Sequence, residues 1–131
     1  MDKTYKCVII DDEQSAVELI SEYLNMLSGD FQIVRYTDPM EAAVEFVGPK
    51  PVDFLFIDIS MYVSGLDIAR KFRSQIRFLI FISGYSRFAV DAFTVGADHF
   101  LLKPLSFQRF LDSLNQVLKR NQQSEFSPLP L

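Results

Sequence analysis

The sequence has little or none of several features that mark large classes of protein. Cysteine occurs once, as Cys7 inside an apolar stretch, so an internal disulfide is impossible and a reducing compartment is expected. No apolar run approaches the ~20 residues that cross a bilayer. The first residues, MDKTYK, are not followed by the long apolar segment of a signal peptide. We therefore expect a cytoplasmic protein.

Positive charge is also scarce. The chain has 13 Lys and Arg against 17 Asp and Glu, a net charge of -4, so no face is obviously built for nucleic acid. DNA contact is expected only through an output domain outside this chain. Hydrophobic residues make up 49% of the 131 residues and include 13 Phe, which is enough to build the core of one domain.

Short apolar runs alternate with helical patterns along the chain. Runs rich in β-branched and aromatic residues predict strands at residues 5–10, 31–36, 52–57, 78–82 and 99–102. Apolar residues at helical spacing predict five helices. These cover residues 16–27 with Gly29 as the stop, 38–47 with Asp38 as the N-cap, 66–73, 86–93 capped by Ser86 with Phe93 packed inward, and 106–118 capped by Ser106.

Almost entirely apolar strands indicate a parallel sheet that is covered on both faces. With right-handed crossovers, the pattern predicts an α/β fold: a flavodoxin-like, doubly wound, five-stranded parallel sheet of order 2-1-3-4-5 with five helices. Residues 1–120 form this domain. Residues 121–131 are polar and contain Pro, so we expect a linker or disordered tail, such as a chain cut before an output domain would carry.

Carboxylates follow two strands that should be neighbours in this sheet. Ligands bind beyond the carboxyl ends of the strands, where the strand order reverses, which is between the first and third strands. The first strand leads into Asp11-Asp12-Glu13, and the third ends at Asp58. Carboxylates that lie close together repel each other, and this repulsion raises a pKa unless a cation neutralises their charge. Oxygen ligands favour a hard divalent ion, so we predict Mg²⁺.

Two more polar residues close the remaining strands. Ser83 ends the fourth strand, and Lys103 follows the fifth. Carboxylate, metal, hydroxyl and ammonium groups together suit a phosphoryl group, with Asp58 as the nucleophile that forms an acyl phosphate. Each residue also has a plainer interpretation as a helix-dipole partner, a turn residue or a solvated charge. Their convergence on one edge favours the phosphoryl site.

These residues resemble the receiver domain of bacterial two-component response regulators over residues 5–119. The matching motifs are VIIDDE (8–13), FID (56–58), SGLD (64–67), FISGY (81–85) and GADHFLLKP (96–104). The spacing from Ser83 to Lys103, with FAVDAF between them, is most similar to receivers that precede a LytTR-type DNA-binding domain.

The resemblance implies that Asp58 accepts phosphate from a sensor histidine kinase. Asp11, Asp12, Asp58 and the backbone carbonyl of Ser60 would hold Mg²⁺. Such a protein dephosphorylates itself and is a switch, without the free turnover substrate of an enzyme.

The resemblance also assigns the remaining residues. Lys103 would pair with the phosphate, and the Lys103–Pro104 bond would be cis. Ser83 would be the switch hydroxyl and Phe100 the aromatic switch residue, although an edge-strand core Phe is the alternative. Phosphorylation would change the surface of the fourth helix, fifth strand and fifth helix, which could form a homodimer and control an output, transcription above all.

One loop departs from the family pattern. Family members usually carry Met-Pro after the Asp and reach a Gly eight residues on, whereas here Gly65 comes seven residues after Asp58 and the Pro is missing. Because Pro restricts the backbone, we expect a looser loop or a re-aimed Ser60 carbonyl. This keeps open a pseudo-receiver, a phosphorylation-independent protein-interaction module.

Two enzyme or cofactor classes fit less well. A haloacid-dehalogenase-like phosphatase wants Asp-x-Asp, but Ser60 stands at the second position after Asp58. A flavin binder wants a hydroxyl- or Gly-rich phosphate loop after the first strand, where Asp11-Asp12-Glu13 would repel the phosphate.

Overall fold

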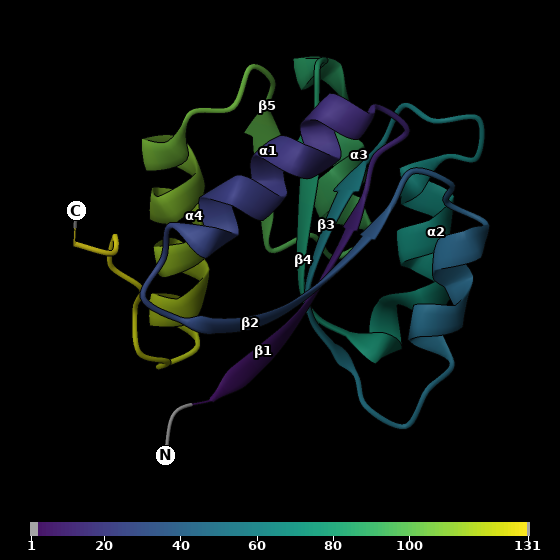
Figure 1. Ribbon diagram of the computed structural model, residues 1–131. Helices are drawn as coiled ribbons and strands as arrows, with labels where there is room; N and C mark the ends of the chain where they lie inside the picture. Colours follow the sequence, from purple (N-terminus) through teal and green to yellow (C-terminus); the bar gives the residue numbers. More distant parts are fainter. Residues whose placement is uncertain (1–2, 131) are drawn as a thin grey trace.

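The computed structural model describes residues 3–130, and its centre is a five-stranded parallel sheet (Figure 1). The strands stand in the order β2-β1-β3-β4-β5, as predicted. Their bounds are β1 Thr4–Ile10, β2 Asp30–Tyr36, β3 Val52–Asp58, β4 Ile76–Ser83 and β5 His99–Leu102. All four pairings are parallel, so the carboxyl ends of the strands meet at one edge.

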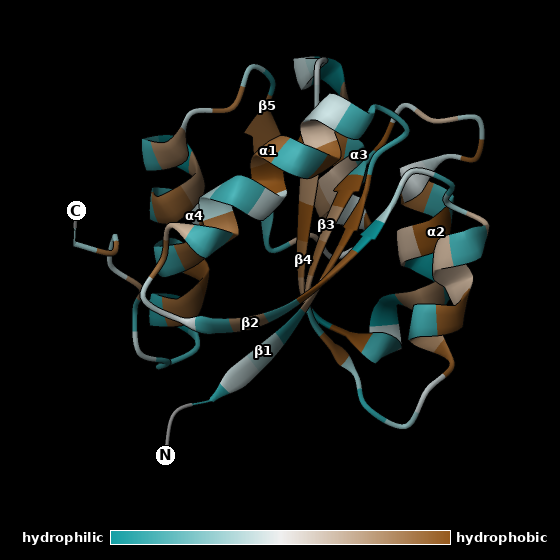
Figure 2. Cartoon of the chain, viewed as in Figure 1, coloured by the Kyte–Doolittle hydropathy of each residue, from teal (hydrophilic) through white to brown (hydrophobic). Residues whose placement is uncertain are grey.

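Side chains that alternate along the strands fill a core on each face of the sheet. Phe54 and Phe56 belong to one cluster, together with residues of α1 Gln14–Asn25 and α4 Phe107–Arg120. Leu55 and Ile57 belong to the other, with residues of α2 Gly65–Phe72 and α3 Ala89–Thr94. The central strands β3 and β4 are therefore largely apolar, and the sheet lies between two helical layers (Figure 2). No helix in residues 3–130 is long and apolar enough to span a membrane.

Five helical segments follow the strands, and their ends show which capping predictions hold. The predicted N-cap Ser106 accepts a hydrogen bond from the Arg109 amide at 3.2 Å and opens α4. Ser86 was wrong as a cap, because it is the first residue of the short 3-10 helix η3 Ser86–Phe88 that leads into α3. The first helix ends at Asn25, four residues before the predicted stop Gly29.

The second helical segment is a 3-10 helix, η1 Glu41–Phe46, and not the predicted α-helix. Asp38 still accepts a hydrogen bond from the Met40 amide at 2.9 Å, but the helix begins three residues after it. Nine residues separate Pro39 from Pro49, which leaves room for a short helical segment only, and the 3-10 winding is used mainly in such short pieces. A further 3-10 turn, η2 Arg73–Gln75, follows α2.

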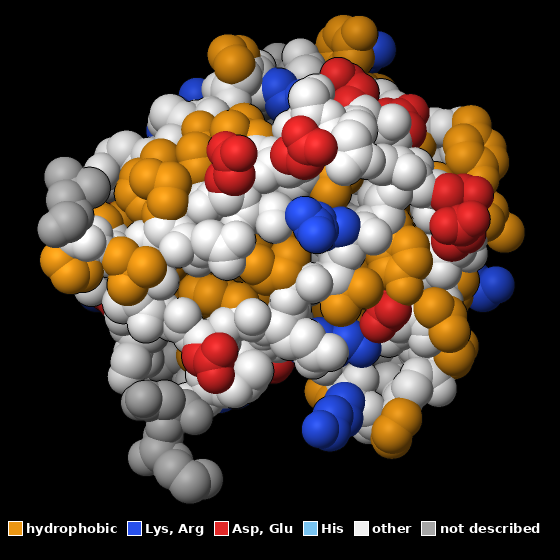
Figure 3. Space-filling model, in the orientation of Figure 1, with side chains coloured by type: hydrophobic (Ala, Val, Ile, Leu, Met, Phe, Trp, Pro, Cys, Tyr) orange, Lys and Arg blue, Asp and Glu red, His pale blue; other side chains and the backbone are white. Residues whose placement is uncertain are grey.

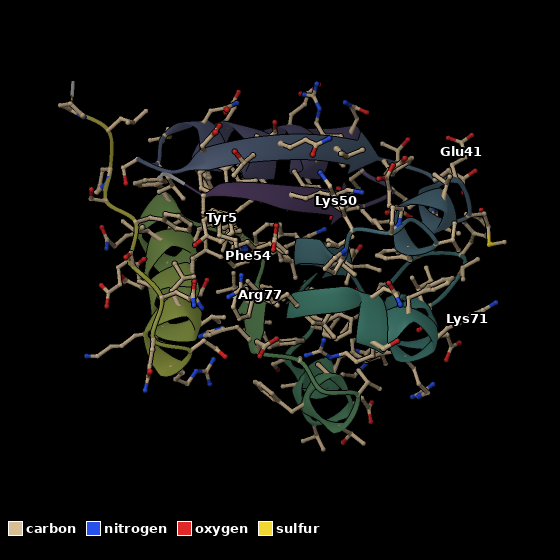
Figure 4. The ribbon with its side chains drawn as sticks, turned by 90° about the horizontal axis from the view of Figure 1, so that it is seen from below. Tyr5, Glu41, Lys50, Phe54, Lys71 and Arg77 are labelled. Carbon is tan, nitrogen blue, oxygen red and sulfur yellow. The ribbon has the colours of Figure 1, made fainter. Side chains whose placement is uncertain are left out.

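The segment after α4, for which the sequence predicted a linker or disordered tail at residues 121–131, packs against the domain through residues 121–130. Phe126 is only 7% exposed, and its ring lies 5.4 Å from Tyr5 and 5.0 Å from Phe31. Asn115 on α4 binds both the amide and the carbonyl of Phe126. Leu27 and Pro128 form an antiparallel bridge. Seen from below, Tyr5 and Phe54 lie beside α4 at this amino edge of the sheet (Figure 4).

We expect the tail to contribute to stability through Phe126. Phe126→Ala removes a buried ring and should lower the free energy of unfolding by about 3 kcal/mol, measured by urea denaturation. Phe93 is the matched control. It was predicted to pack inward but is 53% exposed, so Phe93→Ala should cost less than about 0.5 kcal/mol. Equal effects of the two substitutions would mean that the tail does not dock in solution.

Candidate phosphoryl-transfer site

The polar residues singled out in the sequence collect at the carboxyl edge of the sheet, the upper edge in Figure 1. Asp11 directly follows β1, Asp58 ends β3, Ser83 ends β4, and Lys103 directly follows β5. Acidic side chains are visible at the upper part of the molecular surface (Figure 3). The parallel register therefore brings four chain-distant residues to one place, where the strand order reverses.

The ammonium group of Lys103 joins the carboxylates of this edge. Its Nζ lies 2.8 Å from Oδ2 of Asp11, 3.7 Å from Oδ2 of Asp58 and 3.6 Å from Oε1 of Glu13. Asp11 is 1% exposed and Asp58 is 5% exposed. The bond between Lys103 and Pro104 is cis, as the resemblance implied. The single Lys103 ammonium group thus lies close to three carboxylates, two of which are buried.

Burial and like charge make Asp58 a weaker acid than an ordinary aspartate. Desolvation is the largest cause, the negative charge of Asp11 adds to it, and the pKa of Asp58 rises to about 6. Lys103 and the Ser60 amide act in the opposite direction. Burial by itself would lower the pKa of Lys103, but its hydrogen bond to Asp11 and the nearby carboxylates raise it. At neutral pH Lys103 is therefore cationic and Asp58 is mostly ionised.

Three adjacent carboxylates provide oxygens for a hard cation. One oxygen from each of Asp11, Asp12 and Glu13 lies within 4.8 Å of the others. This donor set fits a small divalent ion such as Mg²⁺. Glu13 was part of the predicted acidic run but was not assigned as a ligand. Sequence reasoning could have identified the exposed Glu13 as a candidate ligand only from its position next to Asp11 and Asp12.

The two predicted switch residues are differently placed. Ser83 is fully buried, and its hydroxyl accepts a hydrogen bond from the Tyr85 amide at 3.1 Å. In this arrangement the hydroxyl is engaged within its own turn. Phe100 is half-buried on β5 and packs against the core cluster that faces α2 and α3. The geometry thus shows where both residues lie and leaves their switching roles as predictions.

The loop between β3 and α2 is closed by a glycine. A Cβ on Gly65 would lie 2.2 Å from the carbonyl oxygen of Asp58, so only glycine lets the short loop return this closely. The amides of Met61 and Gly65 both donate to the Ile59 carbonyl at 3.1 Å. The Ser60 amide reaches Oδ1 of Asp58 at 3.3 Å. The loop therefore turns directly beside the acidic site.

Residues 7–115 match the family described as the response regulator receiver domain. The chain belongs to this family. Its members are signalling switches that interact with histidine kinases and typically bind Mg²⁺ at an acidic pocket, for which the carboxylates after β1 are suited. The match ends before the docked tail.

Proteins similar in sequence to this chain include response regulators, in agreement with the resemblance predicted from the sequence. The chain is 32% identical over 127 residues to an uncharacterized response regulatory protein of Vibrio cholerae, covering 92% of this chain and 49% of that protein. It is 33% identical over 115 residues to the sensory transduction protein LytR of Staphylococcus haemolyticus, covering 86% of this chain and 44% of that protein. The chain thus spans about half the length of these curated relatives.

Solved structures place the fold in the same family. The response regulatory domain of protein mrkE from Klebsiella pneumoniae superposes with a TM-score of 0.77 at 27% identity, covering 90% of this chain and 99% of that one. The chemotaxis response regulator CheY4 of Vibrio cholerae gives 0.76 at 21% identity, covering 88% and 100%. The second likeness bears on the fold alone.

The raised pKa of Asp58 predicts that its charge destabilises the fold without metal. The pKa is about 6 in the folded chain and ~3.9 in the unfolded chain. Between these values the folded state binds more protons, so stability falls as pH rises. Asp58→Asn should therefore increase the free energy of unfolding by about 2 kcal/mol at pH 7.5 without Mg²⁺, and by almost nothing below pH 4.

Urea denaturation across this pH range measures the effect. Glu22→Gln is the control, because Glu22 is exposed on α1 and its substitution should change the free energy of unfolding by less than about 0.5 kcal/mol. An Asn variant less stable than the parent at pH 7.5 would show that the Lys103 contact outweighs the cost of burying the Asp58 charge.

Proposed function

We propose that this receiver domain accepts a phosphoryl group on Asp58 in a Mg²⁺-dependent reaction. The observation that carries the proposal is the contact of Lys103 with both Asp11 and Asp58 at the topological switch point. Oδ2 of Asp58 attacks the phosphorus atom, and the bond from phosphorus to the donor atom breaks. The donor leaves with the electron pair of that bond, and the phosphoryl group remains on Asp58 as an acyl phosphate. Self-catalysed hydrolysis then returns the carboxylate.

The proposed roles of the other residues follow from their positions. Asp11, Asp12, Asp58 and the Ser60 carbonyl would hold Mg²⁺, and Glu13 is near enough to assist. When bound, the ion supplies positive charge to the phosphoryl oxygens. Lys103 supplies a second positive charge beside Asp11 and Asp58. Ser83 would exchange its bond with the Tyr85 amide for one with the phosphoryl group.

A sensor histidine kinase is the proposed phosphodonor, and a groove beside the site offers it a surface. This groove of about 410 Å³ lies between α1 and the segment after β5. Its lining is mostly apolar, including Leu19, Ile20 and Pro104, and it reaches Lys103. An apolar helix face of a donor could pack here while its phosphorylated side chain approaches Asp58.

The proposed output surface lies around η3, α3, β5 and α4. Tyr85, Val90 and Phe93 are 50%, 77% and 53% exposed there, which is apolar area suited to a partner. We propose that phosphorylation at Asp58 changes this surface through Ser83 and Phe100, and that it forms a homodimer. We further propose that the receiver domain controls a LytTR-type output domain that regulates transcription. The proposed location of the protein is the cytoplasm.

Incubation with acetyl phosphate and Mg²⁺ tests the function directly. Intact-mass spectrometry should show the addition of one phosphate to the parent and none to Asp58→Asn. Lys103→Met should be phosphorylated at least about tenfold more slowly, because a charge that faces the transferred group is lost. Glu22→Gln again serves as the unaffected control.

Other outcomes would overturn the proposal. Phosphate addition to both the parent and Asp58→Asn would exclude Asp58 as the acceptor. A folded parent that gains no phosphate and binds no Mg²⁺ would instead indicate the pseudo-receiver, a phosphorylation-independent interaction module.

A further inference from the structure

The loop that carries the Ser60 carbonyl, residues 59–64, is held differently on its two sides. Ile59 is 3% exposed, and Met61 and Val63 pack against the core cluster beneath α2. The alternate residues Ser60 and Tyr62 are exposed. Hydrophobic packing therefore fixes the inner side of the loop and does little for the exposed residues Ser60 and Tyr62.

Tyr62 provides the missing anchor on the outer side. Its hydroxyl donates a hydrogen bond of 2.6 Å to Oδ1 of Asp38, which lies 24 residues away. The same oxygen accepts the Met40 amide at 2.9 Å, so the turn before η1 already holds Asp38 in place. Within residues 3–130 this is the loop's only side-chain hydrogen bond to a segment distant in sequence.

The contact depends on the hydroxyl more than on the ring. Tyr62 is 71% exposed, so its ring buries little area. The hydrogen bond lowers the pKa of Asp38 and raises the pKa of Tyr62, as expected when a phenol donates to a carboxylate. Replacement of the hydroxyl alone should therefore release the loop without disturbing the core.

We propose that Tyr62 is a positioning residue for the Mg²⁺ site, acting through its hydrogen bond to Asp38. Tyr62 follows Met61, where the family usually has Pro. A Pro stiffens such a loop by restricting its backbone. Here a bond between two side chains takes over that restraint and limits the movement of the segment that carries the Ser60 carbonyl. The inference rests on the proposed function, because it assumes that Ser60 binds the metal.

Calorimetric titration of the full chain with Mg²⁺ alone tests this role. Tyr62→Phe should weaken Mg²⁺ binding about threefold, the scale of one exposed hydrogen bond. Phosphorylation by acetyl phosphate should then need more Mg²⁺ but reach the parent rate at saturation, since Tyr62 touches no reacting group. A purely structural role would lower thermal stability and leave the Mg²⁺ dependence unchanged.

Thr4→Val is the matched control. It removes another exposed side-chain hydrogen bond, that from Thr4 to Asp30 at 2.8 Å, between segments 26 residues apart at the opposite edge of the sheet. Mg²⁺ affinity should not change in this variant.

Asp38→Asn supplies an independent test of the same bond. Asn still accepts the Met40 amide but offers Tyr62 a weaker, uncharged acceptor. Its effect should have the same direction as that of Tyr62→Phe, and the double variant should lose less than the product of the two single effects.

The outcomes separate the inference from the function on which it rests. If the parent binds Mg²⁺ and Tyr62→Phe binds it equally well, the positioning role is wrong and the proposed function stands. The role is equally wrong if Thr4→Val weakens binding as much as Tyr62→Phe does. If the parent binds no Mg²⁺, both proposals fail together.

Discussion

The contact of Lys103 with Asp11 and Asp58 is the constraint on which the carboxyl edge of the sheet depends. Two buried carboxylates in the same place repel each other and lose solvation. The Lys103 ammonium offsets part of that cost, and the elevated pKa of Asp58 shows that the compensation is incomplete. The edge therefore remains short of positive charge, which favours binding of a further cation.

The strand order makes this arrangement possible. Asp11 and Asp58 follow neighbouring strands because the chain crosses from β1 to β2 and returns past β1 to form β3. Lys103 follows the edge strand β5, two strands away from β3, and its long side chain spans that distance to come within 3.7 Å of Asp58. Hydrophobic strands packed between helices thus determine which charged residues meet, although none of these charges is needed to form the sheet.

The sheet is determined by hydrophobic patterning and the site by where the strands end, and this explains how much of the structure the sequence could predict. Strand positions, sheet order and the convergence of Asp11, Asp58, Ser83 and Lys103 follow from apolar patterning and from the parallel connection rule. Ser106 was identifiable as a cap because it directly precedes a strong helical pattern. These features each depend on local residue pattern or on topology, and both can be read along the chain.

Features that depend on a single tertiary contact were missed. Phe126 is one aromatic residue in a polar segment, and only the hollow beside Tyr5 and Phe31 makes it a core residue. The 3-10 form of η1 reflects limited space between two prolines more than helix propensity. The position of Gly65 against the Asp58 carbonyl could not be deduced, because it depends on the path of the whole loop.

The contacts of Gly65 and Tyr62 change the interpretation of the β3–α2 loop, which departs from the family pattern. Judged from the sequence, a lost Pro and a missing residue should loosen the loop. In the structure, Gly65 permits a closer return and Tyr62 reaches Asp38, so two features of different kinds restrain the same segment.

The two restraints differ in what can break them. The Gly65 contact is steric and insensitive to solvent, whereas the Tyr62 bond is exposed and competes with water. The loop is therefore firmly closed at its base and only conditionally fixed near Ser60. This places the adjustable part of the acidic site in the loop, while Asp11, Asp58 and Lys103 are held by the strands.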